Sequence, residues 1–248
     1  IVVLLILGKN VIYTNHGKAI LGVTTKNLVK YIYCVAGDLV LRFLGSKIRS
    51  VYVSSTDNSG KSIVIPNAVI DVKVEKKKIT KTNTLLLATA RNIGLKNIDF
   101  VLEYLSSRHH GYKLVLICPN LTKSQEAMLN HIPHVHFEFL SRDELVHQIC
   151  KAEYAVFPSV QESNSNMLLE LAVLGNKLIV SDIPNNKEIV SEEDAAYFSI
   201  GSFKSFEKSL ARAKEQNVVT FEARRAKLMS ARSPEIIGKK YSNLFHNV

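Results

Sequence analysis

The sequence contains no tryptophan and only three cysteines among its 248 residues. Cys34, Cys118 and Cys150 are odd in number, widely spaced and set in apolar runs, so they support neither a disulfide framework nor a zinc site. We expect reduced, structural thiols in a cytoplasmic protein. The apolar opening run Ile1–Leu7 is too short to span a bilayer and lacks the features of a signal peptide, which predicts a buried strand. Because a core strand comes first and no Met precedes it, we expect that earlier residues are missing.

Acidic residues are comparatively scarce. There are 32 Lys and Arg against 22 Asp and Glu, a formal net charge of +10. This balance favours anionic partners, which include nucleic acid, phosphorylated ligands and an anionic membrane face. The basic runs Lys76–Lys78 and Arg224–Arg225 are not interleaved with aromatic residues, as a nucleic-acid stacking surface would be. We therefore expect no nucleic-acid partner.

Short apolar runs alternate with helical periodicity from Leu85 onward, which predicts an α/β fold with a doubly wound parallel sheet. Turn-rich residues 54–62 and polar residues 72–84 flank a domain boundary near Ala68. We predict a remnant of an N-terminal domain at 1–67, a second domain at 68–232 and a terminal helix within 233–248. Strands are predicted at 85–88, 114–117, 135–137, 154–157 and 178–180, and helices at 98–107, 124–131, 142–151, 166–174 and 234–245.

Two glutamates, Glu162 and Glu170, stand eight positions apart around a polar turn. The apolar strand Tyr154–Phe157 ends at Pro158, and a helix is predicted to start after Glu162, which places Glu170 about two turns in. A helix start carries free N–H groups and the positive end of the helix dipole, so the strand, turn and helix together suggest an anion site. The spacing alone equally fits a solvated loop acid and a surface helix acid.

The surrounding residues resemble the nucleotide-sugar site of family-four glycosyltransferases, retaining enzymes of the GT-B fold. The family pattern is Pro-Ser, two residues, Glu, seven residues, Glu, which the segment from Pro158 to Glu170 matches. Ala90–Asn97 is similar to the family's Arg-x4-Lys element, Ile63–Ala68 to its Ile-Pro-Asn-Gly segment, and Ser181–Pro184 to its Ser-Asp-Ile-Pro loop. The resemblance implies a GT-B protein in which part of a second Rossmann-like domain precedes the sugar-nucleotide domain and the last helix crosses back to it.

The resemblance implies catalytic roles for Glu162, Arg91 and Lys96. Arg91 and Lys96 would hold the departing diphosphate, and N–H groups near Asn166 and Met167 would assist them. Cations and N–H groups placed there stabilise a leaving group whose negative charge grows in the transition state. Glu162 would contact hydroxyls of the donor sugar. Neither a metal nor another cofactor is then expected.

Further substrate contacts follow from the same resemblance. Glu170 corresponds to the glutamate that binds the ribose hydroxyls, and Phe139 and Leu140 to the loop that meets the base. His16 is similar to a histidine that faces the donor sugar. Asn164 and Ser165 lie where the family has a glycine-rich turn, so they are expected to contact the donor as well.

Several residues depart from the family pattern. Ser163-Asn164-Ser165 replaces Gly-Phe-Gly, and Ala68 replaces a glycine. His134 and His136 share a strand face at a spacing that can bind metal, but no Cys or acid stands nearby at ligand spacing, and we expect ordinary surface histidines.

The resulting hypothesis is a retaining glycosyltransferase that moves a sugar from a nucleoside-diphosphate sugar, such as a UDP sugar, to a glycan or lipid-linked acceptor. Bacterial surface polysaccharide synthesis (O-antigen, capsule or exopolysaccharide) is the expected setting by family analogy. The basic charge suits a lipid-linked acceptor at the inner membrane face, so peripheral association of this cytoplasmic protein with an anionic membrane is a further hypothesis. Two alternatives stay open: a nucleotide-sugar-binding module without turnover, and a nucleotide-sugar epimerase of the same fold.

Overall fold

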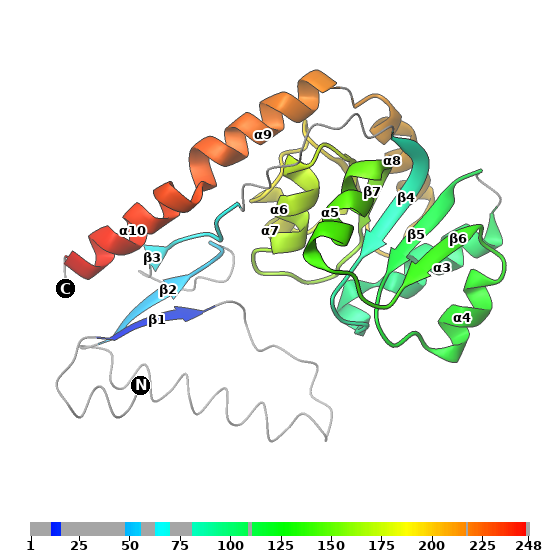
Figure 1. Cartoon of the computed structure of the whole chain (residues 1–248), viewed down its shortest axis with the longest axis horizontal. Helices are drawn as coiled ribbons and strands as arrows, with labels where there is room; N and C mark the ends of the chain where they lie inside the picture. The colour runs from blue at the N-terminus through cyan, green and yellow to red at the C-terminus, as the bar shows by residue number, and fades with distance from the viewer. Residues whose placement is uncertain are drawn as a thin grey trace. The chain divides into compact units, whose positions relative to one another are not determined.

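The structure is a computed structural model that describes residues 11–15, 48–55, 63–69, 81–108, 111–216 and 218–246. Two compact units form (Figure 1): one contains residues 1–67 and 235–248, and the other contains residues 68–234. The opening run Ile1–Leu7, His16, Cys34 and the Lys76–Lys78 run lie outside the described residues.

The smaller unit contains a parallel sheet of three strands in the order β1-β2-β3. Val51 and Val53 are buried there, as is Ile65, whose N–H donates to the carbonyl of Tyr52 at 2.9 Å. Residues of the last helix belong to the same unit, and this helix buries Ile237. The elements are β1 (Val11–Asn15), β2 (Ile48–Tyr52), β3 (Ile63–Val64) and α10 (Pro234–His246).

The larger unit alternates strands and helices, as the sequence predicts. Its strands are β4 (Thr82–Ala88), β5 (Lys113–Ile117), β6 (His134–Phe137), β7 (Ala152–Phe157), β8 (Lys177–Ser181) and β9 (Ala196–Phe198). Its helices are the 3-10 turn η1 (Gly94–Lys96), α3 (Ile98–Ser107), α4 (Lys123–Leu129), α5 (Arg142–Lys151), α6 (Asn166–Val173), α7 (Pro184–Lys187), α8 (Phe203–Lys214) and α9 (Val218–Arg232).

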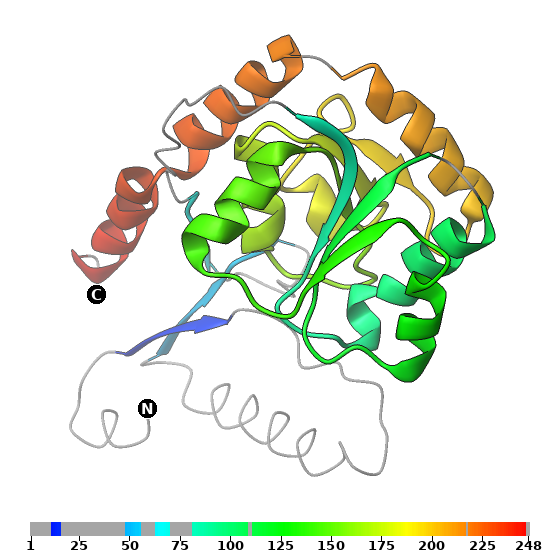
Figure 2. The same cartoon turned by 45° about the vertical axis from the view of Figure 1, so that its right-hand side comes forward.

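The six strands pair in parallel in the order β6-β5-β4-β7-β8-β9. The chain builds β4, β5 and β6 toward one edge and then returns to place β7 on the other side of β4. Figure 2 shows these strands twisting across one another, with helices on both sides of the sheet. This order confirms the predicted doubly wound sheet and puts its topological switch point between β4 and β7. In such sheets ligands bind outside the carboxyl ends of the strands at the switch point.

Alternation along β4 shows that the sheet is buried on both faces. Leu85 and Leu87 point into one hydrophobic cluster, whereas Leu86 and Ala88 point into another. The first cluster is covered by α3, α4 and α8, and the second by α5, α6 and α9. A strand buried on both faces has a continuous apolar run, which explains why 85–88 is predicted so readily.

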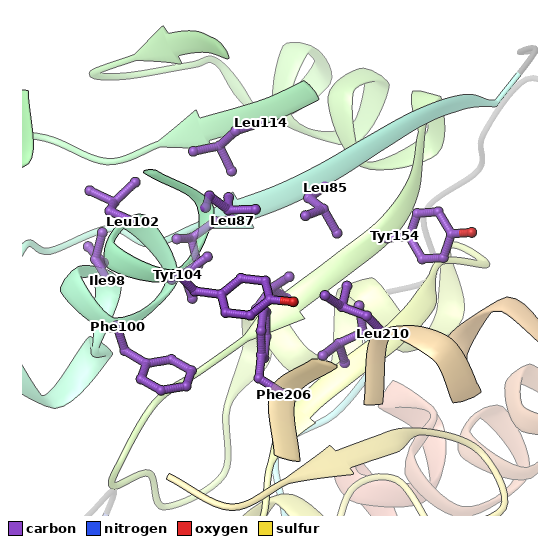
Figure 3. Close-up of a cluster of buried hydrophobic side chains, with 14 of the residues drawn as sticks. Leu85, Leu87, Ile98, Phe100, Leu102, Tyr104, Leu114, Tyr154, Phe206 and Leu210 are labelled. Atoms are coloured by element: carbon purple, nitrogen blue, oxygen red, sulfur yellow. The ribbon is translucent and has the colours of Figure 1, made fainter. Parts of the chain in front are cut away.

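Aromatic rings hold α3 and α8 on the first face (Figure 3). The rings of Phe100 and Phe198 stack with their centroids 5.6 Å apart, and Tyr104 meets Phe206 edge to face at 4.8 Å. Such pairs contribute about 0.5–1.5 kcal/mol each beyond the area that they bury. Helices α3 and α8 are therefore firmly packed against the first face of the sheet.

Helix α6 starts where the predicted range 166–174 has it, but Glu170 lies less deep in the helix than expected. Ser165 is the N-cap residue and accepts a hydrogen bond from the N–H of Leu168 at 3.3 Å, so the helix begins at Asn166. Glu170 is the fifth residue of α6 and lies about one turn in, not two. Nor is Glu170 a surface acid, because only 8% of it is exposed.

A buried guanidinium fixes α9 against the second face. Arg224 is 1% exposed and donates to the carbonyls of Ala172, Asp194 and Asn176 at 2.7–2.9 Å. Ala172 lies in the last turn of α6, where carbonyls have no partner within the helix. Arg224 thus belongs to the packing of the unit and not to a surface basic patch.

Candidate functional site

A cavity of about 280 Å³ opens at the switch point, at the carboxyl ends of β4 and β7. One wall is the loop after β4, and another is the turn after β7 with the first turn of α6. Charged, polar and apolar side chains all face it. The lining residues are Leu87, Ala88, Thr89, Ala90, Arg91, Lys96, Arg142, Leu145, Phe157, Pro158, Ser159, Asn166, Met167 and Glu170.

The loop after β4 carries the two predicted cations. The Thr89 hydroxyl donates to the carbonyl of Arg91 at 3.0 Å and accepts from the N–H of Arg91 at 3.3 Å, which folds the loop back on itself. The amide of Asn92 donates to the side chain of Gln125 at 2.7 Å and to the carbonyl of Asn120 at 2.8 Å. This loop is therefore anchored on α4, and its position does not depend on a ligand.

The loops after β4 and β7 are joined directly. Asn97 has a left-handed backbone with φ of 53°, a conformation that Asn tolerates, and its amide donates to the carbonyl of Pro158 at 3.2 Å. The N–H of Val160 donates to the carbonyl of Leu95 at 2.9 Å. These contacts bring the Arg-x4-Lys element beside the Pro-Ser…Glu element, although the two are far apart in sequence.

Lys96 and Glu162 form an ion pair with Nζ and Oε1 2.5 Å apart. Their side chains are 20% and 12% exposed, so the pair is shielded from water on most sides. Lys96 lines the cavity, whereas Glu162 does not. Arg91 also lines the cavity, is exposed, and forms no ion pair with the described part of the chain.

Sequence reasoning missed Arg142. Its Nη1 lies 2.7 Å from Oε2 of Glu170, and both residues line the cavity. Arg142 is the first residue of α5, directly after the N-cap Ser141, which forms a capping box with Glu144. The capping box marks this position as a helix start, but nothing local in the sequence indicates a partner 28 residues away.

Helix α6 presents its amino end to the cavity through Asn166 and Met167. The first N–H groups of a helix have no partner within it, and together with the helix dipole they favour a negative charge. The cavity therefore combines a helix start, the cations Arg91, Lys96 and Arg142, and one buried carboxylate.

Other predicted contacts lie elsewhere in the unit. Asn164 is buried, and its Oδ1 accepts from Nη1 of Arg232 at 3.0 Å. Ser165 is the buried N-cap of α6. Phe139 is 75% exposed, and Leu140 packs at the margin of the second hydrophobic cluster. None of these four residues lines the cavity.

The two histidines of β6 contact different backbone carbonyls. His134 Nδ1 lies 2.8 Å from the carbonyl oxygen of Ile132, and His136 Nε2 lies 2.8 Å from that of Cys118. Within the residues that the structure describes, no group of three or more His, Cys, Asp or Glu side chains is placed to hold a metal ion.

Two parallel sheets and a cavity at the switch point of the larger one are the features of the GT-B fold. Comparison with solved structures confirms this fold, and the neighbours are glycosyltransferases. No protein-family model matches the sequence, and comparison with curated protein sequences gives no significant match.

Three solved structures illustrate the likeness. A glycosyltransferase from Rickettsia africae ESF-5 superposes with a TM-score of 0.74 at 11% identity, covering 99% of this chain and 78% of that one. WaaG, a glycosyltransferase involved in lipopolysaccharide biosynthesis, gives 0.70 at 14% identity, covering 92% and 73%. The UDP-forming α,α-trehalose-phosphate synthase from Burkholderia vietnamiensis gives 0.70 at 11% identity, covering 99% and 71%.

Proposed function

We propose that the protein is a glycosyltransferase that takes a sugar from a nucleoside-diphosphate sugar and transfers it, with retention of configuration, to a glycan or lipid-linked acceptor. The observation that carries the proposal is the clustering of Arg91 and Lys96 with the amino end of α6 around one cavity. A diphosphate carries the charge that these groups complement.

The size of the cavity indicates which part of the ligand it holds. About 280 Å³ lies just below the usual range of ligand pockets, roughly 300–1,000 Å³. Such a volume suits the diphosphate and the attached ribose better than a whole nucleotide sugar. Glu170 supplies the acceptor oxygen that ribose hydroxyls need. The base then extends toward Phe139 and Leu140, and the exposed ring of Phe139 offers a stacking surface.

In the proposed reaction the bond between the anomeric carbon of the sugar and the diphosphate breaks, an acceptor hydroxyl oxygen bonds to that carbon, and the hydroxyl proton passes to the departing diphosphate or to water. Negative charge grows on the leaving phosphate as its bond to the sugar breaks. Arg91 and Lys96 stabilise this charge more strongly in the transition state than in the ground state, which lowers the barrier. Glu162, which is paired with Lys96 before the ligand binds, contacts hydroxyls of the donor sugar. In this scheme the positive side chains and the α6 N–H groups neutralise the leaving group.

The acceptor and setting are proposed from likeness. One structural neighbour, WaaG, is described as acting in lipopolysaccharide biosynthesis, which favours bacterial surface polysaccharide synthesis. The net charge of +10 favours contact with an anionic membrane surface. None of the helices in the described ranges has the length and apolar character that a bilayer span requires.

Calorimetry with UDP and GDP tests the proposal. We expect the unmodified protein to bind one of them with a millimolar or lower Kd. Arg91→Ala and Glu170→Ala should each weaken binding roughly tenfold, because each loses a charge-assisted hydrogen bond of about 1.5 kcal/mol. The matched control is Arg108→Ala, which removes another exposed arginine, paired with Glu207 outside the cavity. It should leave the affinity unchanged.

Failure to bind UDP and GDP, or equal binding by Arg91→Ala, Glu170→Ala and Arg108→Ala, would refute the proposed site. Release of free nucleotide from UDP-glucose and GDP-mannose then distinguishes transfer from binding alone. Binding without any release of nucleotide would favour a binding module. Product analysis that finds an isomerised donor would favour an epimerase.

A further inference from the structure

Arg142 and Glu170 form a pair that joins two helices at the rim of the cavity. Arg142 stands at the start of α5 and Glu170 in the second turn of α6, and Nη1 and Oε2 lie 2.7 Å apart. Their side chains differ in exposure, 43% for Arg142 and 11% for Glu170. The arginine therefore reaches from the solvent-facing edge of the cavity onto a carboxylate that the fold has already buried.

Arg142 engages one oxygen of this carboxylate. Oε2 accepts from Arg142, and Oε1 accepts no hydrogen bond from any residue that the structure describes. A carboxylate has about four acceptor positions on its two oxygens, so one bond to arginine leaves room for others. A nearly buried carboxylate with an open acceptor oxygen in a cavity is suited to a ligand that donates hydroxyl hydrogens.

We infer that Arg142 is a positioning residue that fixes the Glu170 carboxylate so that its free oxygen accepts from the ribose of the donor, which makes the site selective for ribonucleotides over 2′-deoxyribonucleotides. This inference rests on the proposed function. Without Arg142 the side chain of Glu170 can rotate about its own torsions, and the open oxygen no longer has one defined direction. The guanidinium also offsets the repulsion between Glu170 and the neighbouring diphosphate.

Arg142 has a different effect from Arg91 and Lys96 in this scheme. A residue that only attracts phosphate strengthens ribo- and deoxyribonucleotides equally, because both carry the same diphosphate. A residue that directs Glu170 onto the ribose strengthens only the ligand that has the 2′-hydroxyl. The ratio of the two dissociation constants separates these roles.

Isothermal titration calorimetry provides the test. The probes are UDP with 2′-deoxy-UDP and GDP with 2′-deoxy-GDP, measured on the full chain and on the variants Arg142→Ala, Arg142→Lys and Glu170→Gln. Arg108→Ala is the control, since its side chain is 42% exposed and it also loses one positive charge from an ion pair with glutamate. Melting temperatures without nucleotide verify that each variant is folded.

For the unmodified protein and for Arg108→Ala we expect the deoxy form to bind about tenfold more weakly, the loss of one hydrogen bond to a charged group. In Arg142→Ala and Glu170→Gln the ratio of the Kd for the deoxy form to the Kd for the ribo form should fall to about two or less. Arg142→Lys should keep roughly half of the preference for the ribo form, measured on a logarithmic scale, because the positive charge remains.

An unchanged ratio in a folded Arg142→Ala variant that still binds nucleotide would overturn the inference alone. The same holds if Arg142→Ala weakens both forms equally, since Arg142 would then act on the phosphates. If the unmodified protein binds none of the four nucleotides, the proposed function itself fails. The two failures are therefore distinguishable.

Discussion

Replacing Glu162 by glutamine should strengthen nucleotide binding and slow sugar transfer. Glu162 is the ion-pair partner of Lys96 at 2.5 Å, and the pair is largely shielded from water. A diphosphate that uses Lys96 has to compete with this carboxylate. Glu162→Gln removes the competitor and one negative charge, so the free nucleoside diphosphate should bind more tightly, while transfer from the sugar nucleotide should slow because the sugar loses a contact.

The magnitude follows from the bond that the ligand no longer has to displace. A hydrogen bond between charged groups contributes about 1.5–3 kcal/mol net, and the lower value suits a pair that keeps some solvent access. A gain of about 1.5 kcal/mol corresponds to roughly a tenfold lower Kd for UDP or GDP. Without ligand the variant should lose about 1 kcal/mol of unfolding free energy, since Lys96 is left without its partner.

A second ion pair supplies the control. Lys177 and Glu153 lie 2.9 Å apart with side chains 18% and 28% exposed, at the amino ends of β7 and β8, which is the opposite end of the sheet from the cavity. Glu153→Gln changes the net charge by the same amount as Glu162→Gln. Urea unfolding should show similar losses of unfolding free energy for the two variants. Calorimetry should show tighter nucleotide binding for Glu162→Gln alone.

Two results would refute this reasoning. Weaker or unchanged binding of UDP and GDP by Glu162→Gln would show that the diphosphate does not use Lys96. Equal tightening by Glu153→Gln would show a general effect of net charge. In either case the assignment of Lys96 to the leaving group would have to be abandoned.

Three further predictions concern the scaffold of the larger unit. Arg224→Met should lower the unfolding free energy in urea by about 3 kcal/mol, because three buried carbonyls lose their donor, whereas Lys227→Ala on the exposed side of the same helix should change it by less than about 0.5 kcal/mol. Burial raises the pKa of the Cys118 thiol to about 11, so in a Cys34→Ser background iodoacetamide at pH 8 should label Cys118 at least roughly tenfold faster in urea than in the native protein. Asn97→Ala should lower the unfolding free energy by about 1–2 kcal/mol in thermal melts, since Ala adopts the left-handed backbone less readily than Asn and the bond to Pro158 disappears, and Asn97→Gly should recover part of this loss.

The raised pKa of Cys118 also predicts how the stability of the fold changes with pH. The fold favours the neutral thiol, because its pKa of about 11 lies above the ordinary value of about 8.5 for an exposed thiol. Between these two values the unfolded chain has lost the proton and the native chain has kept it. Stability should therefore fall as pH rises from about 8.5 toward 11. A Cys118→Ala variant that shows the same alkaline slope would assign the slope to other groups.

Local patterns predicted the sheet and its neighbouring helices well. The helices 98–107 and 142–151 begin and end where the sequence places them, because α3 buries a broad apolar face and α5 starts with a capping box at Ser141. The buried strands were identified from unbroken apolar runs, but β4 begins three residues earlier, at Thr82. Those first residues are polar, and hydrogen bonding to β7 rather than side-chain burial extends the strand.

Residues from about 184 to 232 received no predicted element, although four elements lie there: α7, β9, α8 and α9. β9 has only three residues, which is too short for alternation to show. In α9 the buried positions include Arg224 and Arg232, and a pattern of apolar and polar residues assigns charged side chains to solvent. Only the three-dimensional structure reveals the carbonyls that these guanidinium groups bind.

The predicted range 166–174 fits α6, but the expectation that the helix starts just after Glu162, with Glu170 two turns in, is wrong. Ser163, Asn164 and Ser165 are all good N-cap residues, so the sequence permits more than one start. The structure selects Ser165, and the Asn164 side chain instead accepts from Arg232, 68 residues away. Tertiary hydrogen bonds decide between caps that are locally equivalent.

The charges of the site explain how several cations share one cavity before any ligand arrives. Lys96 is paired with Glu162 and Arg142 with Glu170, so two of the three cations that line the cavity are already neutralised. Arg91, with no ion pair to the described residues, is the cation most open to an incoming diphosphate. Removing Arg91 should therefore weaken nucleotide binding, whereas removing the carboxylate of Glu162 should strengthen it. Weaker nucleotide binding in Arg91→Ala and stronger binding in Glu162→Gln would be hard to explain by a change in fold stability. Neither substitution adds a contact within the protein, so a loss of stability would weaken binding in both variants.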